Sequence, residues 1–218
     1  MFRLSMFAGK SNSFRPTKQH AEGTKRVNMS EFTQKSLGLG NIRQAVVLPD
    51  GEDRNEWLAA NTVDFFNEIS LIWGIVTESG VPSKAPGEGF PPGFEYSWAD
   101  GVKIKKPIQC SGPAYVEYVI SWVEDMINDE TLFPTSSTSP FPRHFESVLR
   151  KMYTRLFRVF AIIYTNHVEG LEALGATAHL NSSFKHFLFF VWEFNLVEDK
   201  ELAVLQDIVS DMKTKYST

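Results

Sequence analysis

Apolar residues recur at helical spacing along most of the chain, on one face of each expected helix. Long helices are predicted over about residues 53–77, 113–128, 143–169, 182–194 and 199–215. In the first of them, Phe66, Ile69, Trp73 and Val76 follow one another at intervals of three and four. The segment 182–194 is apolar nearly all round, which is typical of a helix in the middle of a bundle.

Glycine and proline separate these helices. Residues 79–93 contain four Gly and four Pro, and LFPTSSTSPFP at 132–142 is a second loop. Asp100-Gly101 stands between two short runs rich in aromatic and β-branched residues, which predicts a β-hairpin. We find no internal repeat. The predicted fold class is therefore all-α, a helical bundle with one small β-hairpin.

Charge divides the chain of 218 residues into two parts. Residues 1–30 contain six Lys or Arg and one Glu, whereas the whole chain carries a net charge of −4. We therefore expect a basic, flexible N-terminal arm over 1–32 and a helical domain over 33–218, with a glycine-containing connector at 36–41. The acidic domain argues against nucleic acid as the main partner and favours basic partners, although a merely solvated acidic surface is equally compatible.

Composition and motifs give no support for an enzyme or a membrane protein. The longest apolar runs, such as 187–192, are far shorter than a membrane span, and the start of the chain does not read as a secretion signal. The single cysteine, Cys110, rules out an internal disulfide and fits a reducing compartment. It precedes a helix, but nothing nearby marks it as a nucleophile. The histidines lack metal-ligand spacing, and we predict no cofactor.

An acidic surface is expected on the first long helix. Asp53, Glu56, Trp57 and Asp64 fall at spacings that can place them on one face. A tryptophan among carboxylates could anchor a basic helix of a partner. Alternatively, Trp57 belongs to the core and the acids are simply solvated.

A basic stripe is expected on the helix over 143–169. Lys151, Arg155 and Arg158 lie at positions i, i+4 and i+7, opposite the apolar face. Arginine clusters bind phosphate through bidentate, charge-assisted hydrogen bonds. Pairing with acids such as Glu169 or Glu172 is the alternative.

Four long blocks of sequence resemble the Mob/phocein family of kinase activators. They are LGLGNIRQAVVLPDGEDRNEWLAANTVDFFNEI (37–69), EYSWADGVKIKKPIQCSGPAYVEYVISWVEDMINDETLFP (95–134), FPRHFESVLRKMYTRLFRVFAIIY (141–164) and AHLNSSFKHFLFFVWEFNLVEDKELAVLQ (178–206). The GEDxNEW and NTVDFFN strings are similar to the branch that activates NDR/LATS kinases. The resemblance implies a helical bundle without enzyme activity. It also implies an adaptor and co-activator that binds the basic N-terminal extension of such a kinase, in a Hippo-like or mitotic-exit-like pathway.

The resemblance also implies site residues. The family's kinase-binding face falls on Glu52, Glu56, Trp57 and Asp64, and we add Asp53 because it is adjacent. The implied localisation is cytoplasmic, and also nuclear or at spindle poles and the division site.

The family's phosphopeptide pocket carries the pattern Lys-Arg-x-x-Arg and reads a phosphothreonine of an upstream MST/Hippo-like kinase. Here the pattern begins with Thr154, followed by Arg155 and Arg158, so the lysine is missing. We predict that Lys151, one turn earlier, supplies the lost cation. Two regulatory phosphorylation sites of the family match Ser13 and Ser36. Phosphate at Ser36 is expected to move the basic arm off the acidic face.

One family feature is missing. The family holds a structural zinc ion with two Cys and two His, but here the loop 79–93 has no Cys, Ile162 replaces the first His, and only His167 remains. We therefore predict no zinc. Two other roles stay open, a phosphopeptide-reading scaffold and a phocein-like subunit of a striatin–phosphatase complex, although the GEDxNEW string argues against the second.

Overall fold

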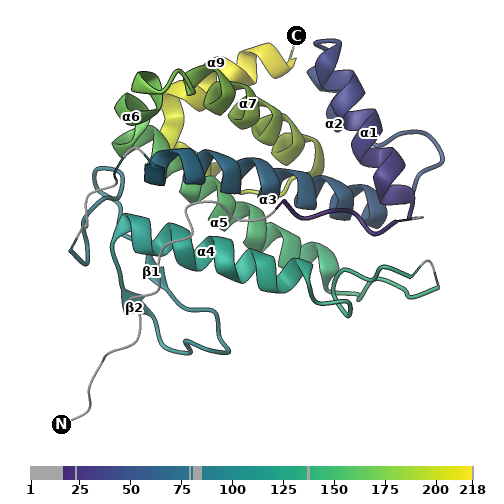
Figure 1. Cartoon of the computed structure of the whole chain (residues 1–218), viewed down its shortest axis with the longest axis horizontal. Helices are drawn as coiled ribbons and strands as arrows, with labels where there is room; N and C mark the ends of the chain where they lie inside the picture. The colour runs from purple at the N-terminus through teal and green to yellow at the C-terminus, as the bar shows by residue number, and fades with distance from the viewer. Residues whose placement is uncertain (1–16, 23, 79, 81–84, 137, 218) are drawn as a thin grey trace.

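The computed structural model describes residues 17–22, 24–78, 80, 85–136 and 138–217, with the side chains of 215–217 excepted. Its elements, in chain order, are α1 (Lys25–Gly38), α2 (Ile42–Val46), α3 (Arg54–Glu78), β1 (Ser97–Trp98), β2 (Ile108–Gln109), α4 (Gly112–Ile127), α5 (Phe145–Asn166), α6 (Val168–Ala173), α7 (Thr177–Phe194), α8 (Asp199–Leu202), the 3-10 helix η1 (Ala203–Leu205) and α9 (Gln206–Ser217) (Figure 1). The two strands are antiparallel, with Ser97 opposite Gln109. The predicted fold class, all-α with one small hairpin, is confirmed.

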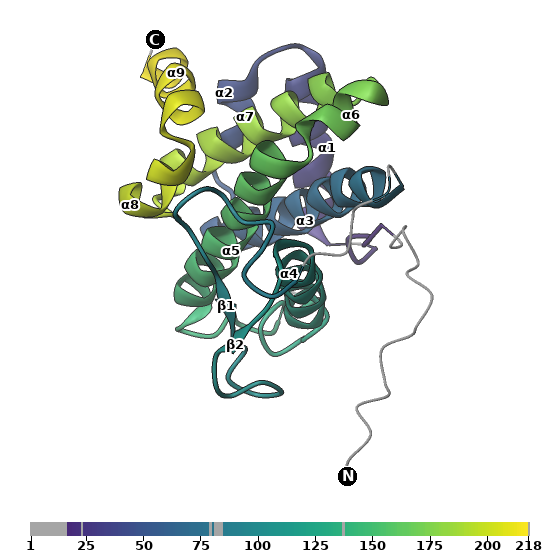
Figure 2. The same cartoon turned by 90° about the vertical axis from the view of Figure 1, so that its left-hand side faces the viewer.

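The core lies where α3, α5 and α7 meet, with α4 along the other side of α3 and α5 (Figures 1 and 2). Aromatic rings fill this junction. Tyr153 of α5 stacks on Phe187 and Phe190 of α7, while Phe65 of α3 packs edge-on against both phenylalanines. These four rings are buried, as expected for a bundle whose central helix is apolar nearly all round.

Helix α1 was not predicted from the sequence, where the first expected helix begins at about residue 53. Its buried positions are Arg26, Met29, Thr33 and Ser36, at helical spacings of three and four. Only Met29 among them is apolar, so a search for hydrophobic periodicity does not detect the helix. The expected boundary between residues 32 and 33 falls inside α1, so residues 25–32 of the expected arm are helical, and α1 packs on α3.

Other helix boundaries also differ from expectation. The helix predicted over 143–169 ends at Asn166, and His167 separates it from the short α6. The helix predicted over 199–215 is divided into α8, η1 and α9. No helix within the described residues is both long enough and apolar enough to cross a membrane.

Part of the glycine- and proline-rich loop is fastened to the start of α4. The Gly87 amide donates to the Cys110 carbonyl at 3.0 Å, and the Gly112 amide donates to the Glu88 carbonyl at 2.7 Å. Gly89 lies so close that a Cβ added at Gly112 would stand 2.0 Å from the Gly89 oxygen. Glycine at position 112 is therefore required by backbone approach.

We expect Gly112→Ala to lower the free energy of unfolding by about 1–3 kcal/mol, because the loop backbone must move to admit the methyl group. Gly38→Ala is the control, since nothing lies within 4 Å of its added Cβ; its effect should stay within about 1 kcal/mol. Urea denaturation of both variants measures the difference. Equal free energies of unfolding for the two variants would show that the loop backbone moves aside with no loss of stability.

Candidate functional site

The first turn of α3 is fixed by Asp53. Its Oδ1 accepts hydrogen bonds from the backbone amides of Asn55, at 2.9 Å, and Glu56, at 3.0 Å. A carboxylate in this position satisfies free amides and complements the positive end of the helix dipole. Asp53, predicted as a partner contact by adjacency alone, therefore has a clear role as the helix cap.

The acidic face of α3, which we define as Glu56 and Asp64 of the helix together with Glu52 just before it, is paired with the chain's own basic residues. Lys25 Nζ lies 3.4 Å from Glu52, Arg26 Nε lies 2.6 Å from Glu56, and His20 Nε2 lies 2.9 Å from Asp64. All three come from residues 18–26, which we call the basic segment.

The backbone and another lysine hold the basic segment in place as well. The Lys18 amide donates to Asn67 Oδ1, and Asn67 Nδ2 donates back to the Lys18 carbonyl, both at 2.8 Å. Lys18 Nζ pairs with Glu124 of α4 at 2.8 Å. The basic segment thus lies along α3 and touches each acid of the face.

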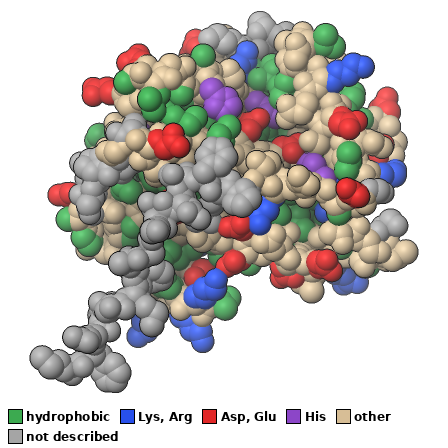
Figure 3. All heavy atoms as spheres, viewed as in Figure 1, with side chains coloured by type: hydrophobic (Ala, Val, Ile, Leu, Met, Phe, Trp, Pro, Cys, Tyr) green, Lys and Arg blue, Asp and Glu red, His purple; other side chains and the backbone are tan. Residues whose placement is uncertain are grey.

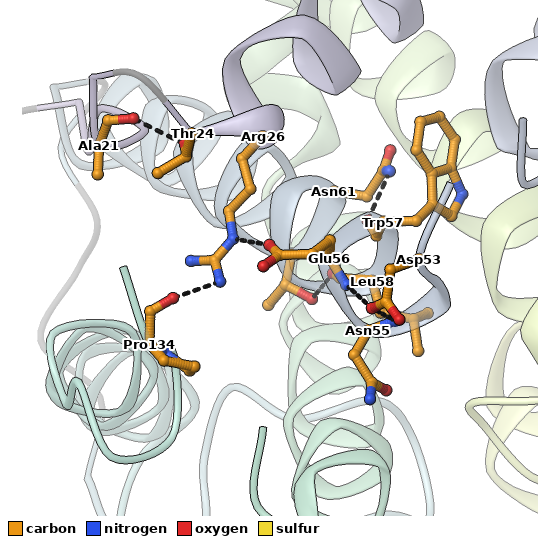
Figure 4. A network of polar contacts seen from close by, with 11 residues as sticks. Ala21, Thr24, Arg26, Asp53, Asn55, Glu56, Trp57, Leu58, Asn61 and Pro134 are labelled. Atoms are coloured by element: carbon orange, nitrogen blue, oxygen red, sulfur yellow. Dashed lines mark hydrogen bonds and ion pairs between the residues drawn. The ribbon is translucent and has the colours of Figure 1, made fainter. Parts of the chain in front are cut away.

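Arg26 makes the deepest of these contacts (Figure 4). Its side chain is only 6% exposed, and its Nη2 donates to the Pro134 carbonyl at 2.6 Å while Nε binds Glu56. Its guanidinium also lies 5.3 Å from the ring centre of Phe141. A carboxylate, a carbonyl and an aromatic face together form a site well suited to an arginine. Beside it lies a cleft of about 760 Å³.

Trp57 is not part of the exposed face. It is fully buried, its Nε1 donates to the Val46 carbonyl at 3.1 Å, and Phe32 packs edge-on against it. Its predicted role as a partner anchor is wrong for this conformation, and the alternative of a core tryptophan is correct. Residues 56 and 57 are neighbours in sequence and so point in different directions from the helix, with Glu56 outward and Trp57 inward.

Of the two predicted phosphorylation sites, Ser36 lies in the described part of the chain. Ser36 is only 4% exposed, on the face of α1 that is turned to the interior. Ser13 lies outside the described residues.

Sequence reasoning missed Glu68, a partly buried acid one turn beyond Asp64. Burial raises the pKa of Glu68 from 4.5 to about 7; a hydrogen bond from Ser183 opposes the shift and the charge of Asp64 adds to it. Burial also lowers the pKa of His186 to about 4, against the attraction of Asp64, and its ring lies 4.6 Å from that of Phe65. The only sequence signal was an acid four residues after Asp64.

The structure brings the predicted basic stripe together in one pocket. Lys151, Arg155 and Arg158 line a cavity of about 370 Å³, and Arg150, Thr154, Asn195, Leu196 and Glu198 complete its wall. Arg150 was not predicted, although its place next to Lys151 in the sequence could have suggested it.

The two arginines of this pocket are held by different partners. Arg155 lies between the rings of Trp98 and Trp122, at 4.4 and 4.3 Å from their centres, and donates to the Ala99 carbonyl at 2.7 Å. Arg158 pairs with Glu201 of α8, which lies beside α5 (Figure 2). The suggested partners Glu169 and Glu172 are therefore not the ones found for Arg158.

On the face shown in Figure 3, acidic side chains are scattered over most of the surface with basic ones among them, and several basic side chains lie close together at its lower edge. This pattern fits the intramolecular pairing of acids with nearby cations.

A structural zinc ion does not fit the residues present. Ile162 is fully buried, with an apolar side chain where the family's ligand would be, and His167 packs edge-on against Trp73 at 5.6 Å. Within the described residues, no three His, Cys, Asp or Glu side chains gather as metal ligands. The described part of the loop is joined to α5 instead, because Asn166 Nδ2 donates to the Gly89 carbonyl at 3.0 Å.

Cys110 lies in a buried environment that does not activate its thiol. Its side chain is buried, and its Sγ lies 3.6 Å from the Tyr96 carbonyl. Burial raises the pKa of the thiol, and the charge of Glu95 adds to this effect. A thiol with a raised pKa is a poor nucleophile near neutral pH, so the geometry offers no activated cysteine.

Comparison with known proteins gives consistent matches along the chain. The model of the Mob1/phocein family matches residues 34–205. A "MOB kinase activator-like 1A" of Arabidopsis thaliana is 48% identical over 204 residues, covering 94% of this chain and 95% of the relative. A "MOB kinase activator-like 1 homolog B" of Dictyostelium discoideum is 46% identical over 218 residues, the whole length of both chains.

We expect Glu68→Gln to stabilise the protein above neutral pH. Because the folded-state pKa of Glu68 is raised, its contribution to stability falls as the pH rises from about 4.5 through about 7. The neutral amide avoids this loss, so the variant should gain about 1–3 kcal/mol at about pH 8 and progressively less towards about pH 5. Urea denaturation at several pH values measures it. Glu172→Gln, an exposed position on α6, is the control; the same pH-dependent gain there would refute the assignment.

Proposed function

Because the chain belongs to the Mob1/phocein family, we propose that it is a non-catalytic co-activator of a protein kinase of the NDR/LATS type. It binds the basic N-terminal extension of that kinase through the acidic face of α3, in a Hippo-like or mitotic-exit-like pathway. It acts in the cytoplasm, and also in the nucleus or at spindle poles and the division site.

The observation that carries this proposal is the set of polar contacts on the acidic face. Glu52 and Glu56 form ion pairs with Lys25 and Arg26, and Asp64 is hydrogen-bonded to His20, all within 3.4 Å and all to the basic segment. A surface that holds one basic segment has the charge and the spacing to hold another. Supporting this, relatives that match this chain over more than nine-tenths of its length bear the name kinase activator.

In this proposal the basic segment and the kinase extension compete for the same carboxylates. Phosphorylation at Ser13 and Ser36 favours the kinase. Ser36 is buried against the domain, and a phosphate of charge about −1.5 to −2 would be costly to enclose there. Phosphorylated Ser36 therefore requires α1 to move outward, and Lys25 and Arg26, the part of the basic segment that lies in α1, move with it.

The charge reversal Glu56→Lys tests the kinase-binding face. Its affinity for the kinase extension should fall roughly 30-fold or more, equivalent to about 2 kcal/mol, because the site then repels a basic ligand. Wild-type binding should weaken as salt is added. Titration of the full chain at low and physiological ionic strength, with Ser36 free or phosphorylated, gives both quantities.

Glu172→Lys on α6 makes the same charge change at an exposed position on another helix and should leave binding close to that of wild type. If Glu56→Lys binds as wild type does, the acidic face is not the kinase site. If wild type binds no kinase extension in either phosphorylation state, a phocein-like role in a striatin–phosphatase complex becomes the better proposal.

A second function is favoured by the basic pocket on α5. Four cations, Arg150, Lys151, Arg155 and Arg158, line one cavity in a chain that is acidic as a whole. We propose that this pocket binds a phosphothreonine of an upstream MST/Hippo-like kinase. Lys151 replaces the lysine that Thr154 has displaced. Its side chain is exposed at the pocket wall, free to follow a ligand.

We expect Lys151→Ala to weaken binding of a phosphothreonine peptide about 5- to 20-fold, the loss of one charge-assisted contact. Fluorescence anisotropy with a labelled peptide measures it. Lys35→Ala, at the exposed end of α1, is the matched control. If Arg150→Ala reduces affinity and Lys151→Ala does not, Arg150 supplies the cation instead.

A further inference from the structure

Arg158 already has a bidentate anionic partner. Its Nε donates to Glu201 Oε2 at 3.1 Å, and its Nη2 lies 3.0 and 2.9 Å from the two carboxylate oxygens. Its Nη1 is 3.4 Å from the Tyr115 hydroxyl, and its guanidinium lies 4.7 Å from the ring centre of Tyr96. Each of its three nitrogens therefore has a partner. The edge that would form a bidentate contact with a phosphate is occupied by a carboxylate.

Glu201 is held in position by the segment that carries it. The next residue, Leu202, is 2% exposed and fastens α8 to the core. The Glu201 side chain is 23% exposed, and that of its partner Arg158 is 24% exposed, so the pair is partly shielded from water. A glutamate can release the arginine by rotating its own side chain, without movement of α8.

The charge of an incoming ligand decides whether this exchange is favourable. A peptide Asp or Glu offers one negative charge and two oxygens, the same as Glu201, and must also lose its freedom in solution. A phosphorylated Thr or Ser offers a charge of about −1.5 to −2 and three acceptor oxygens. A phosphorylated side chain can therefore bind Arg158 more strongly than Glu201 does and displace it. An acidic side chain gains no binding free energy by taking the place of Glu201.

We propose that Glu201 is a specificity-determining residue of the basic pocket, which makes the pocket select phosphorylated side chains over acidic ones. In the free protein Glu201 occupies Arg158. A ligand therefore needs more than one negative charge to displace it with a gain in binding free energy. The inference rests on the second proposed function, since it concerns the selectivity of the phosphopeptide pocket.

The test compares two peptides on the full chain by fluorescence anisotropy. One is a short phosphothreonine peptide flanked by small uncharged residues, and the other has Glu in place of the phosphothreonine. In wild type the phosphopeptide should bind at least 30-fold more tightly, roughly 2 kcal/mol. In Glu201→Gln the Glu peptide should gain about tenfold or more, and the ratio between the peptides should fall.

Asp199→Asn is the matched control, because it removes the same charge from the same short helix. Asp199 is 86% exposed and its nearest cation in an ion pair, Lys213, lies 3.9 Å away. It should change the affinity of both peptides by a similar factor and preserve their ratio. Thermal unfolding of each variant establishes that it is folded. If Glu201→Gln does not fold, Glu201→Asp shortens the side chain while keeping its charge, and it should lower the ratio as well.

The possible outcomes distinguish failure of the Glu201 proposal from failure of the phosphopeptide pocket on which it rests. If Glu201→Gln weakens the phosphopeptide, Glu201 positions Arg158 for the ligand and the inference is overturned. An unchanged ratio overturns it too. In both cases the pocket remains a phosphopeptide site. If no form of the protein binds the phosphopeptide, the second proposed function fails and the inference falls with it.

Discussion

The contact between Thr62 and Tyr153 joins the two helices on which both candidate sites are built. The hydroxyls lie 3.2 Å apart in the core, and the tyrosine ring continues into the aromatic cluster of α7. Because this junction is buried and closely packed, α3 and α5 are fixed relative to each other. The outward side of α3 then presents the acidic face, and the outward side of α5 presents the basic pocket. Neither surface can rotate without disrupting the core.

The two sites share one electrostatic arrangement. Arg26 on the acidic face and Glu201 at the basic pocket each supply a charge of the sign expected of a ligand. An exposed cluster of like charge is costly to maintain, and an internal counter-charge lowers that cost in the free protein. The same counter-charges reduce affinity for any ligand that must displace them. In both proposed functions, binding is therefore an exchange between partners rather than an addition to an empty site.

Much of the bundle could be predicted from the sequence because its long helices carry large apolar side chains at regular intervals. Helix α1 could not, since its buried stripe includes Arg26, Thr33 and Ser36, whose burial depends on contacts with α3. The sequence left open whether Trp57 is exposed or buried. Helical spacing shows which residues share a face, but it does not show which face is turned to the core. The partner of Arg158 lies 43 residues further along the chain, a pairing that spacing within one helix cannot reveal.

The described part of the loop between α3 and α4 is fastened by peptide groups and one asparagine. Hydrogen bonds and apolar contacts form as the chain folds and require no metal-delivery protein. Their strength is insensitive to chelators and to thiol oxidation at this loop, unlike a cysteine-ligated ion. These contacts of the described loop can therefore re-form after unfolding without the capture of an ion.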